Sequence, residues 1–289
     1  MVSGVHGNER WPILAVQHLL KVIRDTNQLL IGKLIVVPHW NPLAVAAWKR
    51  DLKDRDLNRS FGDISNRTID VGMMETPEAN RAMFLKEVIS GWVKYVLDLH
   101  SLSWLSRAPF VYCPHDPAKI AFAQQLWVSH IVIGWAKLAE VLRNKWIERP
   151  LRPGLADYGN SVWKTALTFE AGTHDSPDAE GNVRNFLANA LAVLGMDRDT
   201  SVDRIGWNET VLIDMLDVYL WNSSEDVRFT WIIEPTNFMQ FTERTLVARD
   251  HDQDVYMDAG TILVQPKAVP AMRPWQEAFF IGRSRPQNT

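Results

Sequence analysis

The chain of 289 residues has little cysteine, no block of basic residues and no long apolar run. Its single cysteine, Cys113, excludes an internal disulfide, so we expect a buried thiol in a protein of the reducing cytoplasm. The formal net charge is −3, and without a basic patch neither nucleic acid nor an anionic membrane is an expected partner. No apolar run reaches the roughly 18–20 residues of a transmembrane helix. We also expect no signal peptide, because the first residues lead directly into a polar motif.

Helix-like and strand-like segments alternate over the first two thirds of the chain. Apolar residues at helical spacing predict helices at 11–25, 77–90, 117–129, 135–145 and 180–194. Continuous apolar runs predict buried strands at 33–38, 94–99, 110–112, 131–133 and 165–169, and residues 150–159 are predicted as a Pro/Gly loop. This order predicts an α/β domain with a mostly parallel sheet over residues 1–204. Short strands divided by turns then predict a small β domain over residues 205–289.

A polar motif near the start of the chain, His6-Gly7-Asn8-Glu9, combines an imidazole and a carboxylate that suit Zn²⁺. Such a pair also arises by chance, and a catalytic zinc needs a third ligand and a base. His100 follows the predicted strand 94–99, and Glu170 follows the predicted strand 165–169. Ligands of open α/β sheets bind beyond the carboxyl ends of the strands, so these side chains are expected to converge at one edge of the sheet.

The expected metal ligands are His6, Glu9 and His100. Three protein ligands leave a zinc ion an open position for water, which is typical of a catalytic site. Zinc lowers the pKa of that water to about 7 and polarises a neighbouring carbonyl group. Glu170 is then the candidate for carrying protons between the water and the leaving group.

Four motifs occur in the order and approximate spacing of a known family. They are His6-Gly7-Asn8-Glu9, Asp56-Leu57-Asn58-Arg59-Ser60-Phe61, Asp98-Leu99-His100-Ser101 and Phe169-Glu170-Ala171-Gly172. In them the chain resembles the succinylglutamate desuccinylase/aspartoacylase family, and residues 241–250 and 262–266 look like the β domain of that family. The resemblance implies a fold similar to the zinc carboxypeptidases, with a mostly parallel mixed sheet flanked by helices. It also implies that residues 205–289 cap the active-site cleft.

The resemblance gives roles to a charged loop that otherwise looks like solvated surface. Asn58 and Arg59 match the pair that binds a substrate carboxylate, for which the planar guanidinium is suited. Arg50 resembles the residue that stabilises the oxyanion. Asp56 is expected to orient the loop, and His174, which follows Glu170 closely, is a candidate for substrate contact.

The chain also departs from the pattern of the family. Only a few residues stand before His6, where the family usually has a full first strand. Gly62-Asp63 replaces the usual Pro-Gly, and Trp275-Gln276-Glu277-Ala278-Phe279 replaces a small-residue ending that contains Arg. The basic residue that aspartoacylases carry shortly before the catalytic Glu has no clear counterpart, since Lys164 is only nearby. The acyl group and the amino acid of the substrate therefore stay open.

Three functions follow from these residues. The first is a zinc-dependent amidohydrolase that removes an N-acyl group, such as succinyl or acetyl, from an amino acid or related amine. The second is a carboxypeptidase-like peptidase with the same site, and the third is a non-catalytic binding protein that retains the fold. The expected cofactor is one zinc ion per chain, and the expected partner is a small carboxylate-bearing N-acyl substrate. The oligomeric state stays open, and a homo-oligomer is compatible with the sequence.

Overall fold

The structure is a computed structural model that describes residues 1–26, 30–51, 56–62, 77–102, 105–138, 153–197, 209–221, 229–269 and 277–286. Two predicted features fall outside these residues: residues 139–145 of a predicted helix, and the segment Trp275-Gln276. All eight residues predicted to bind metal, bind substrate or act in catalysis lie inside them.

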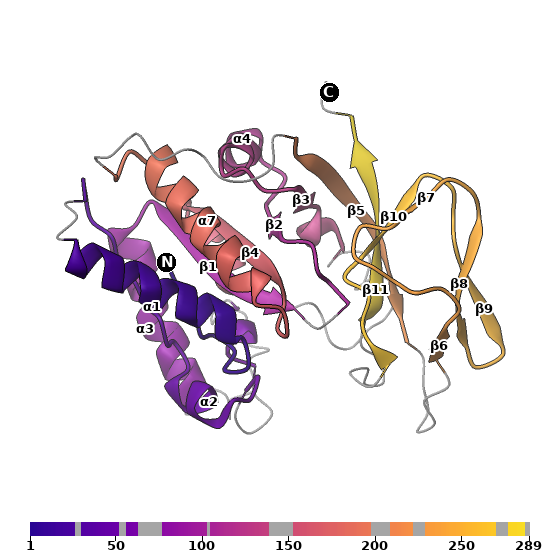
Figure 1. Cartoon of the computed structure of the whole chain (residues 1–289), viewed down its shortest axis with the longest axis horizontal. Helices are drawn as coiled ribbons and strands as arrows, with labels where there is room; N and C mark the ends of the chain where they lie inside the picture. The colour runs from indigo at the N-terminus through magenta and orange to yellow at the C-terminus, as the bar shows by residue number, and fades with distance from the viewer. Residues whose placement is uncertain are drawn as a thin grey trace.

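A mixed sheet of eight strands, ordered β1-β4-β2-β3-β5-β11-β10-β7, forms the centre of the fold (Figure 1). Pairs β1/β4, β2/β3 and β3/β5 are parallel, whereas β2 is antiparallel to β4 and the pairs beyond β5 are antiparallel. The predicted α/β fold with a mostly parallel sheet is therefore confirmed for the region up to β5. The strands are β1 (Tyr95–Leu102), β2 (Phe110–Tyr112), β3 (His130–Ile133), β4 (Thr165–Thr173), β5 (Val211–Leu220), β7 (Gln240–Phe241), β10 (Thr261–Val264) and β11 (Glu277–Arg285).

The β-rich C-terminal region continues the same sheet, because β5 pairs with β3. A second sheet of three strands packs beside it, formed by β6 (Phe229–Trp231), β8 (Thr245–Asp250) and β9 (Gln253–Met257). Figure 1 shows these strands at the end of the molecule away from α1 and α3. The division at residue 205 and the capping of the cleft by residues 205–289 stay predictions.

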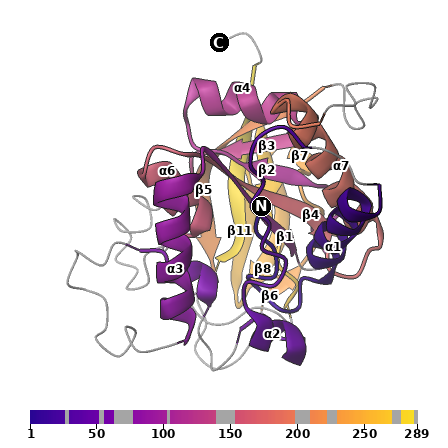
Figure 2. The same cartoon turned by 90° about the vertical axis from the view of Figure 1, so that its left-hand side faces the viewer.

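Helices cover both faces of the parallel part of the sheet. Figure 2 shows α3 and α6 on one side and α1 and α7 on the other. This arrangement explains why Leu97 and Leu99 of β1 pack in the cluster that contains α1 and α7, while Val96 packs with α3 and α6. None of the helices in the described ranges is long and apolar enough to cross a bilayer. The helices are α1 (Arg10–Asp25), α2 (Pro42–Ala47), α3 (Pro77–Trp92), α4 (Pro117–Gln125), α6 (Leu155–Ser161) and α7 (Asp178–Val193).

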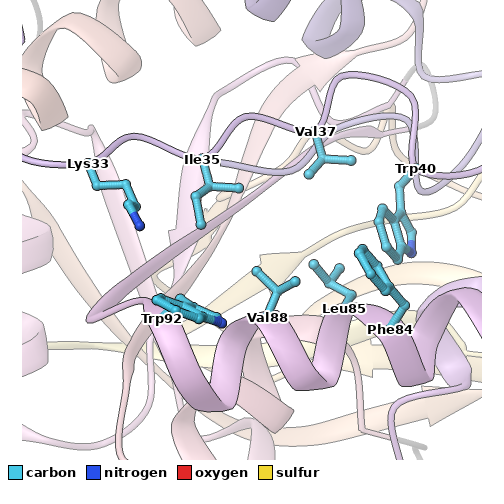
Figure 3. Close-up of a pocket in the computed structure, with 8 residues that line it drawn as sticks. All are labelled: Lys33, Ile35, Val37, Trp40, Phe84, Leu85, Val88 and Trp92. Atoms are coloured by element: carbon cyan, nitrogen blue, oxygen red, sulfur yellow. The ribbon is translucent and has the colours of Figure 1, made fainter.

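The predicted buried strand at residues 33–38 is wrong, because this segment forms only an isolated bridge between Val37 and Val2. It lies at the edge of the sheet, where the Val37 amide donates to Met1 (2.9 Å) and the Val37 carbonyl accepts from Ser3 (2.9 Å). Its apolar side chains are half-buried and divided between two sides: Ile35 and Val37 face α3, whereas Val36 packs against the cluster that contains α1 and α7. Figure 3 shows Ile35 and Val37 opposite Val88 of α3, across a cavity of about 340 Å³. This largely apolar cavity includes none of the predicted site residues.

The few residues before His6 form backbone hydrogen bonds with β1 on one side and with Val37 on the other. The Val2 amide donates to the Leu97 carbonyl (2.9 Å), and the Leu99 amide donates to the Val2 carbonyl (2.9 Å). Together with the bonds to Val37, these contacts insert residues 1–3 between β1 and the sheet edge. The segment that carries His6 is thus anchored to the strand that carries His100.

A second prediction, the loop at residues 150–159, is wrong for its last part, which belongs to helix α6. Local sequence does favour a start there, because the Gly154 amide donates to the Asp157 carboxylate (2.8 Å). The remaining stabilisation is tertiary: Leu155 and Ala156 are buried in one cluster with Val96 and Ala166. A helix this short depends on such packing, which periodicity does not report.

The lone thiol of Cys113 is expected to be unreactive in the folded protein. Its side chain is 4% exposed, and burial raises the pKa of the thiol to about 12. At pH 8 only about one thiol in ten thousand would then be the reactive thiolate. We expect Ellman's reagent to label the unfolded chain in urea within seconds and the native chain far more slowly. Equally rapid labelling of both would contradict the buried position.

Candidate active site

The loop that carries His6 and Glu9 is shaped by its contact with α2. Gly7 lies so close to this helix that a Cβ atom there would overlap the backbone of Ala44, so only glycine allows the approach. The Gly7 amide donates to the Arg50 carbonyl (3.3 Å). Glu9 directly precedes α1, where the positive end of the helix dipole favours a carboxylate. The loop and the helix start thus aim His6 and Glu9 at the same point.

The structure brings His6, Glu9 and His100 together. One Glu9 oxygen lies 2.6 Å from His6 Nδ1, and the other lies 2.9 Å from His100 Nδ1. Each of the three residues offers a ligand atom, and these atoms all lie within 4.8 Å of one another. All three side chains are buried. The spacing and chemistry of these donors suit a single zinc ion.

Two further carboxylates hold the imidazoles in place. Asp56 Oδ1 lies 2.9 Å from His6 Nε2, and Asp98 Oδ1 lies 2.9 Å from His100 Nε2. With a proton on His6 Nε2 facing Asp56, the lone pair of His6 Nδ1 is directed at the point beside Glu9, while Asp98 lies at ion-pair distance from the far nitrogen of His100. Asp56 also accepts a hydrogen bond from the Asn58 amide (2.9 Å). It therefore orients the loop, as the sequence predicts, and in addition contacts His6.

The charges around this point favour a cation. Burial alone would raise the pKa of Glu9, but His6 and His100 outweigh it and hold the pKa well below its usual range. Burial would likewise lower the pKa of His100, but Asp98 and Glu9 outweigh it and raise the pKa well above its usual range. A positive charge at this point is stabilised by three carboxylates. The residues therefore fit a divalent metal ion.

Glu170 stands directly beside His100, because β4 and β1 pair in parallel with these two residues opposite each other. Its side chain is 8% exposed. Burial raises the pKa of Glu170 to about 7, with Glu9 adding to the effect and His100 opposing it. Within the described residues, Glu170 Oε2 has no hydrogen-bond partner. A buried carboxyl with a free oxygen next to the ligand cluster is suited to proton transfer.

The three residues expected to bind substrate or oxyanion line the same region. Arg50 lies 2.9 Å from Asp56 and 3.8 Å from Glu9, at the rim of the ligand cluster. Asn58 uses its side-chain oxygen to accept from the Leu155 amide (3.0 Å), which leaves its NH₂ group to donate elsewhere. Among the residues that the structure describes, the Arg59 guanidinium has no ion-pair partner, and such a guanidinium can bind a carboxylate with both arms.

His174 lies near the ligand cluster through Ser101, the residue after His100. Ser101 Oγ and His174 Nδ1 are 2.8 Å apart, and the Ser101 amide donates to Glu9 (3.3 Å). The His174 backbone is held by Trp11, whose indole donates to its carbonyl (2.7 Å). Burial lowers the pKa of His174, with Glu9 opposing this shift. Its contact with substrate stays a prediction.

Two residues that the fold places here, Asp98 and Tyr112, have no role predicted from the sequence. Asp98 could have been found, because residues two apart on a strand point to the same face and Asp98 precedes His100 by two. Tyr112 of β2 gave no signal, since its position depends on how β2 pairs with β4. Burial raises the pKa of the Tyr112 hydroxyl well above its usual range, and the charge of Glu170 contributes to the shift.

Comparison with known proteins agrees with this arrangement. Residues 1–193 match the profile of the succinylglutamate desuccinylase/aspartoacylase catalytic domain. A succinylglutamate desuccinylase of Serratia proteamaculans is 35% identical over 113 residues, which are 37% of this chain and 32% of that protein. A probable aspartoacylase of Prochlorococcus marinus is 37% identical over 87 residues, which are 30% of this chain and 26% of that protein. The chain thus matches no more than about a third of the length of these curated relatives.

Similarity to solved structures extends over nearly the whole chain. The structure of a succinylglutamate desuccinylase/aspartoacylase from Rhodobacter sphaeroides superposes with a TM-score of 0.73. The superposition covers 98% of this chain and 85% of that chain, at 16% sequence identity. At this identity the similarity shows the fold, including the β-rich C-terminal region.

Proposed function

The chain belongs to the succinylglutamate desuccinylase/aspartoacylase family, as the match over residues 1–193 shows, and from this premise we propose that it is a zinc-dependent amidohydrolase. Its reaction is the removal of an N-acyl group, such as succinyl or acetyl, from an amino acid or related amine. One observation carries the proposal: Glu170 lies beside His100 in the sheet, and His100 shares a buried point with His6 and Glu9.

The residues divide into metal ligands and proton carriers. His6, Glu9 and His100 hold one zinc ion, which when bound lowers the pKa of a water molecule and polarises the amide carbonyl. Glu170 takes a proton from the attacking water and gives it to the leaving nitrogen. The water oxygen forms a bond to the acyl carbon, the carbon–nitrogen bond breaks, and the products are a carboxylate and a free amine.

The remaining residues bind and orient the substrate. Arg59 and the NH₂ group of Asn58 bind the substrate carboxylate, so that the amide lies over the ligand cluster. Arg50 donates to the carbonyl oxygen as negative charge develops on it. His174 contacts the substrate from the end of β4. A cytoplasmic location belongs to the same proposal.

The proposal is tested by measuring amine release from N-succinyl-L-glutamate, N-acetyl-L-aspartate and other N-acyl amino acids. The purified protein is supplied with zinc, its metal content is measured, and a chelator-treated sample serves as the control. We expect hydrolysis of at least one carboxylate-bearing N-acyl amino acid, loss of activity after chelation and recovery with zinc. Unblocked dipeptides are included, and preferential cleavage of them would favour a peptidase. Stoichiometric zinc without any hydrolysis would favour a binding protein.

Replacing Arg59 with lysine is expected to weaken substrate binding much more than the chemical step. The planar guanidinium binds a carboxylate through two parallel hydrogen bonds, which an ammonium group cannot reproduce. We expect KM to rise about tenfold or more with kcat less affected, as for the loss of a hydrogen bond to a charged group. Arg244→Lys is the matched control, since Arg244 is exposed in the β-rich region. Equal KM values for both variants would remove Arg59 from the substrate-binding role.

A further inference from the structure

Tyr112 lies on the same face of the sheet as Glu170. Strand β2 is antiparallel to β4, with Phe110 opposite Glu170 and Tyr112 opposite Thr168. Alternate residues of a strand point to one face, so Tyr112, Phe110 and Glu170 share a face. His100 lies on this face as well, because it is the partner of Glu170 on β1. The Tyr112 side chain is therefore directed to the side of the sheet that carries the catalytic cluster.

The ring of Tyr112 is held in one orientation by two aromatic neighbours. Its centroid lies 5.0 Å from that of Phe110 at an interplanar angle of 77°. It lies 5.3 Å from the centroid of Trp135 at 61°. Both are edge-to-face contacts, which fix a ring as well as pack it. The direction of the Tyr112 hydroxyl is thus determined before any ligand binds.

The Tyr112 hydroxyl is buried and, among the described residues, has no hydrogen-bond partner. A buried hydroxyl without a partner is costly, and native structures rarely retain one without a reason. Its electrostatic neighbours are Glu170, Glu277 and Arg59. Burial raises the pKa of this hydroxyl well above its usual range, and the two carboxylates add to the effect. It therefore stays protonated at neutral pH and can donate a hydrogen bond.

Among the described residues, neither neighbouring carboxylate accepts a hydrogen bond from the Tyr112 hydroxyl. Glu277 of β11 lies 3.2 Å from the Lys267 ammonium group, which already neutralises it. Glu170 Oε2 is itself without a partner among the described residues. Two buried polar atoms on the same face, one on β2 and one on β4, thus lack hydrogen-bond partners in the part of the chain that the structure describes. An acceptor that reaches the Tyr112 hydroxyl would satisfy it, and the positive charge of Arg59, which acts on this hydroxyl, favours an anion there.

We propose that the Tyr112 hydroxyl donates a hydrogen bond to the same substrate carboxylate that Arg59 binds, which makes Tyr112 a specificity-determining residue. This inference rests on the proposed function and extends it to a residue of β2. Tyr112 and Arg59 then approach the carboxylate from different elements of the fold. The enzyme would therefore discriminate against substrates in which this carboxylate is replaced by a neutral amide.

The test compares Tyr112→Phe with Tyr219→Phe, which removes a hydroxyl that donates to Asp250 (3.0 Å) in the β-rich region. For the N-acyl amino acid that the wild type hydrolyses best, we expect Tyr112→Phe to raise KM about tenfold. With the corresponding carboxamide substrate, whose neutral oxygen is a weaker acceptor than a carboxylate oxygen, Tyr112→Phe is expected to raise KM clearly less. Tyr219→Phe is expected to leave KM unchanged with both substrates.

Thermal unfolding of the substrate-free proteins separates binding from structure. Tyr112→Phe removes a hydroxyl without a partner, so its Tm should equal or exceed that of the wild type, whereas Tyr219→Phe removes a made hydrogen bond and should lower Tm. A lower Tm for Tyr112→Phe with unchanged KM would show a structural role and overturn the inference. So would an equal rise in KM for the acid and the carboxamide.

Failure of the proposed function is distinguishable from failure of this inference. If the wild type hydrolyses its substrate and Tyr112→Phe matches it, the inference is overturned while the proposed function stands. If the wild type hydrolyses nothing, the zinc-supplied proteins are titrated with succinate by calorimetry. Binding that is about tenfold weaker in Tyr112→Phe would then support the role of Tyr112 in carboxylate recognition. Equal binding, or none to either protein, would overturn it.

Discussion

Replacing Glu170 with glutamine is expected to lower kcat for amide hydrolysis about a thousandfold, the usual scale of general acid–base catalysis. Glutamine has nearly the same shape as glutamate but cannot accept a proton from water. Because Glu170 lies beside His100 and is not one of the three clustered ligands, the variant should retain stoichiometric zinc. The neutral amide also avoids the cost of burying a charge, so Tm should not fall.

The measurement is kcat with the best substrate of the wild type, together with zinc content and Tm for each protein. Glu78→Gln is the matched control, because Glu78 is also buried, at 6% exposed, but lies in α3 outside the cluster. We expect the control to keep wild-type kcat. Hydrolysis by Glu170→Gln at the wild-type rate, with zinc bound, would assign proton transfer to another group.

Removing a metal ligand is expected to have the second large effect. His100→Ala should weaken zinc affinity by more than a hundredfold, because the loss of an outer partner alone costs about 10–100-fold. Asp98→Asn tests that smaller effect, since Asp98 lies 2.9 Å from the far nitrogen of His100 and is not one of the three clustered ligands. We therefore expect a graded series in zinc affinity: wild type, then Asp98→Asn, then His100→Ala. Activity at limiting zinc should follow the same order.

Competition with a zinc chelator of known affinity measures the series. His18→Ala is the matched control, because His18 lies in α1 and belongs to no metal cluster in the described residues. It should bind zinc like the wild type. Equimolar zinc in His100→Ala at wild-type affinity would show that the metal lies elsewhere. Equal affinities for Asp98→Asn and the wild type would show that Asp98 does not support the ligand.

Local patterns predicted most helices and parallel strands because their signals are long or strongly apolar. The helix at 11–25 and the strand at 94–99 correspond to α1 and β1 within a few residues. The strand predicted at 33–38 is wrong because an apolar run does not tell whether a segment pairs with neighbouring strands along its length or only through one bridge. Helix α6 was not predicted because its seven residues show too little apolar periodicity. Its burial against β1 and β4 is a tertiary effect.

The residue types alone determined the chemistry that this chain supports. Two imidazoles and a carboxylate suit zinc, and a second carboxylate suits proton transfer, whereas the roles of Asn58 and Arg59 are implied by the resemblance to the family. These conclusions follow from the functional groups and their order along the chain, and folding changes neither. They name the ligand set and the motif residues that resemble a known family.

Only the tertiary structure decided how these groups face one another. The pairing of β1 with β4 places Glu170 beside His100, Asp56 contacts the far nitrogen of His6, and Asp98 lies 2.9 Å from that of His100. The pairing of β2 with β4 brings Tyr112 to the same face. Strand register and ring orientation arise from contacts between residues far apart in the chain, and spacing along the sequence does not specify which strands pair or in which register.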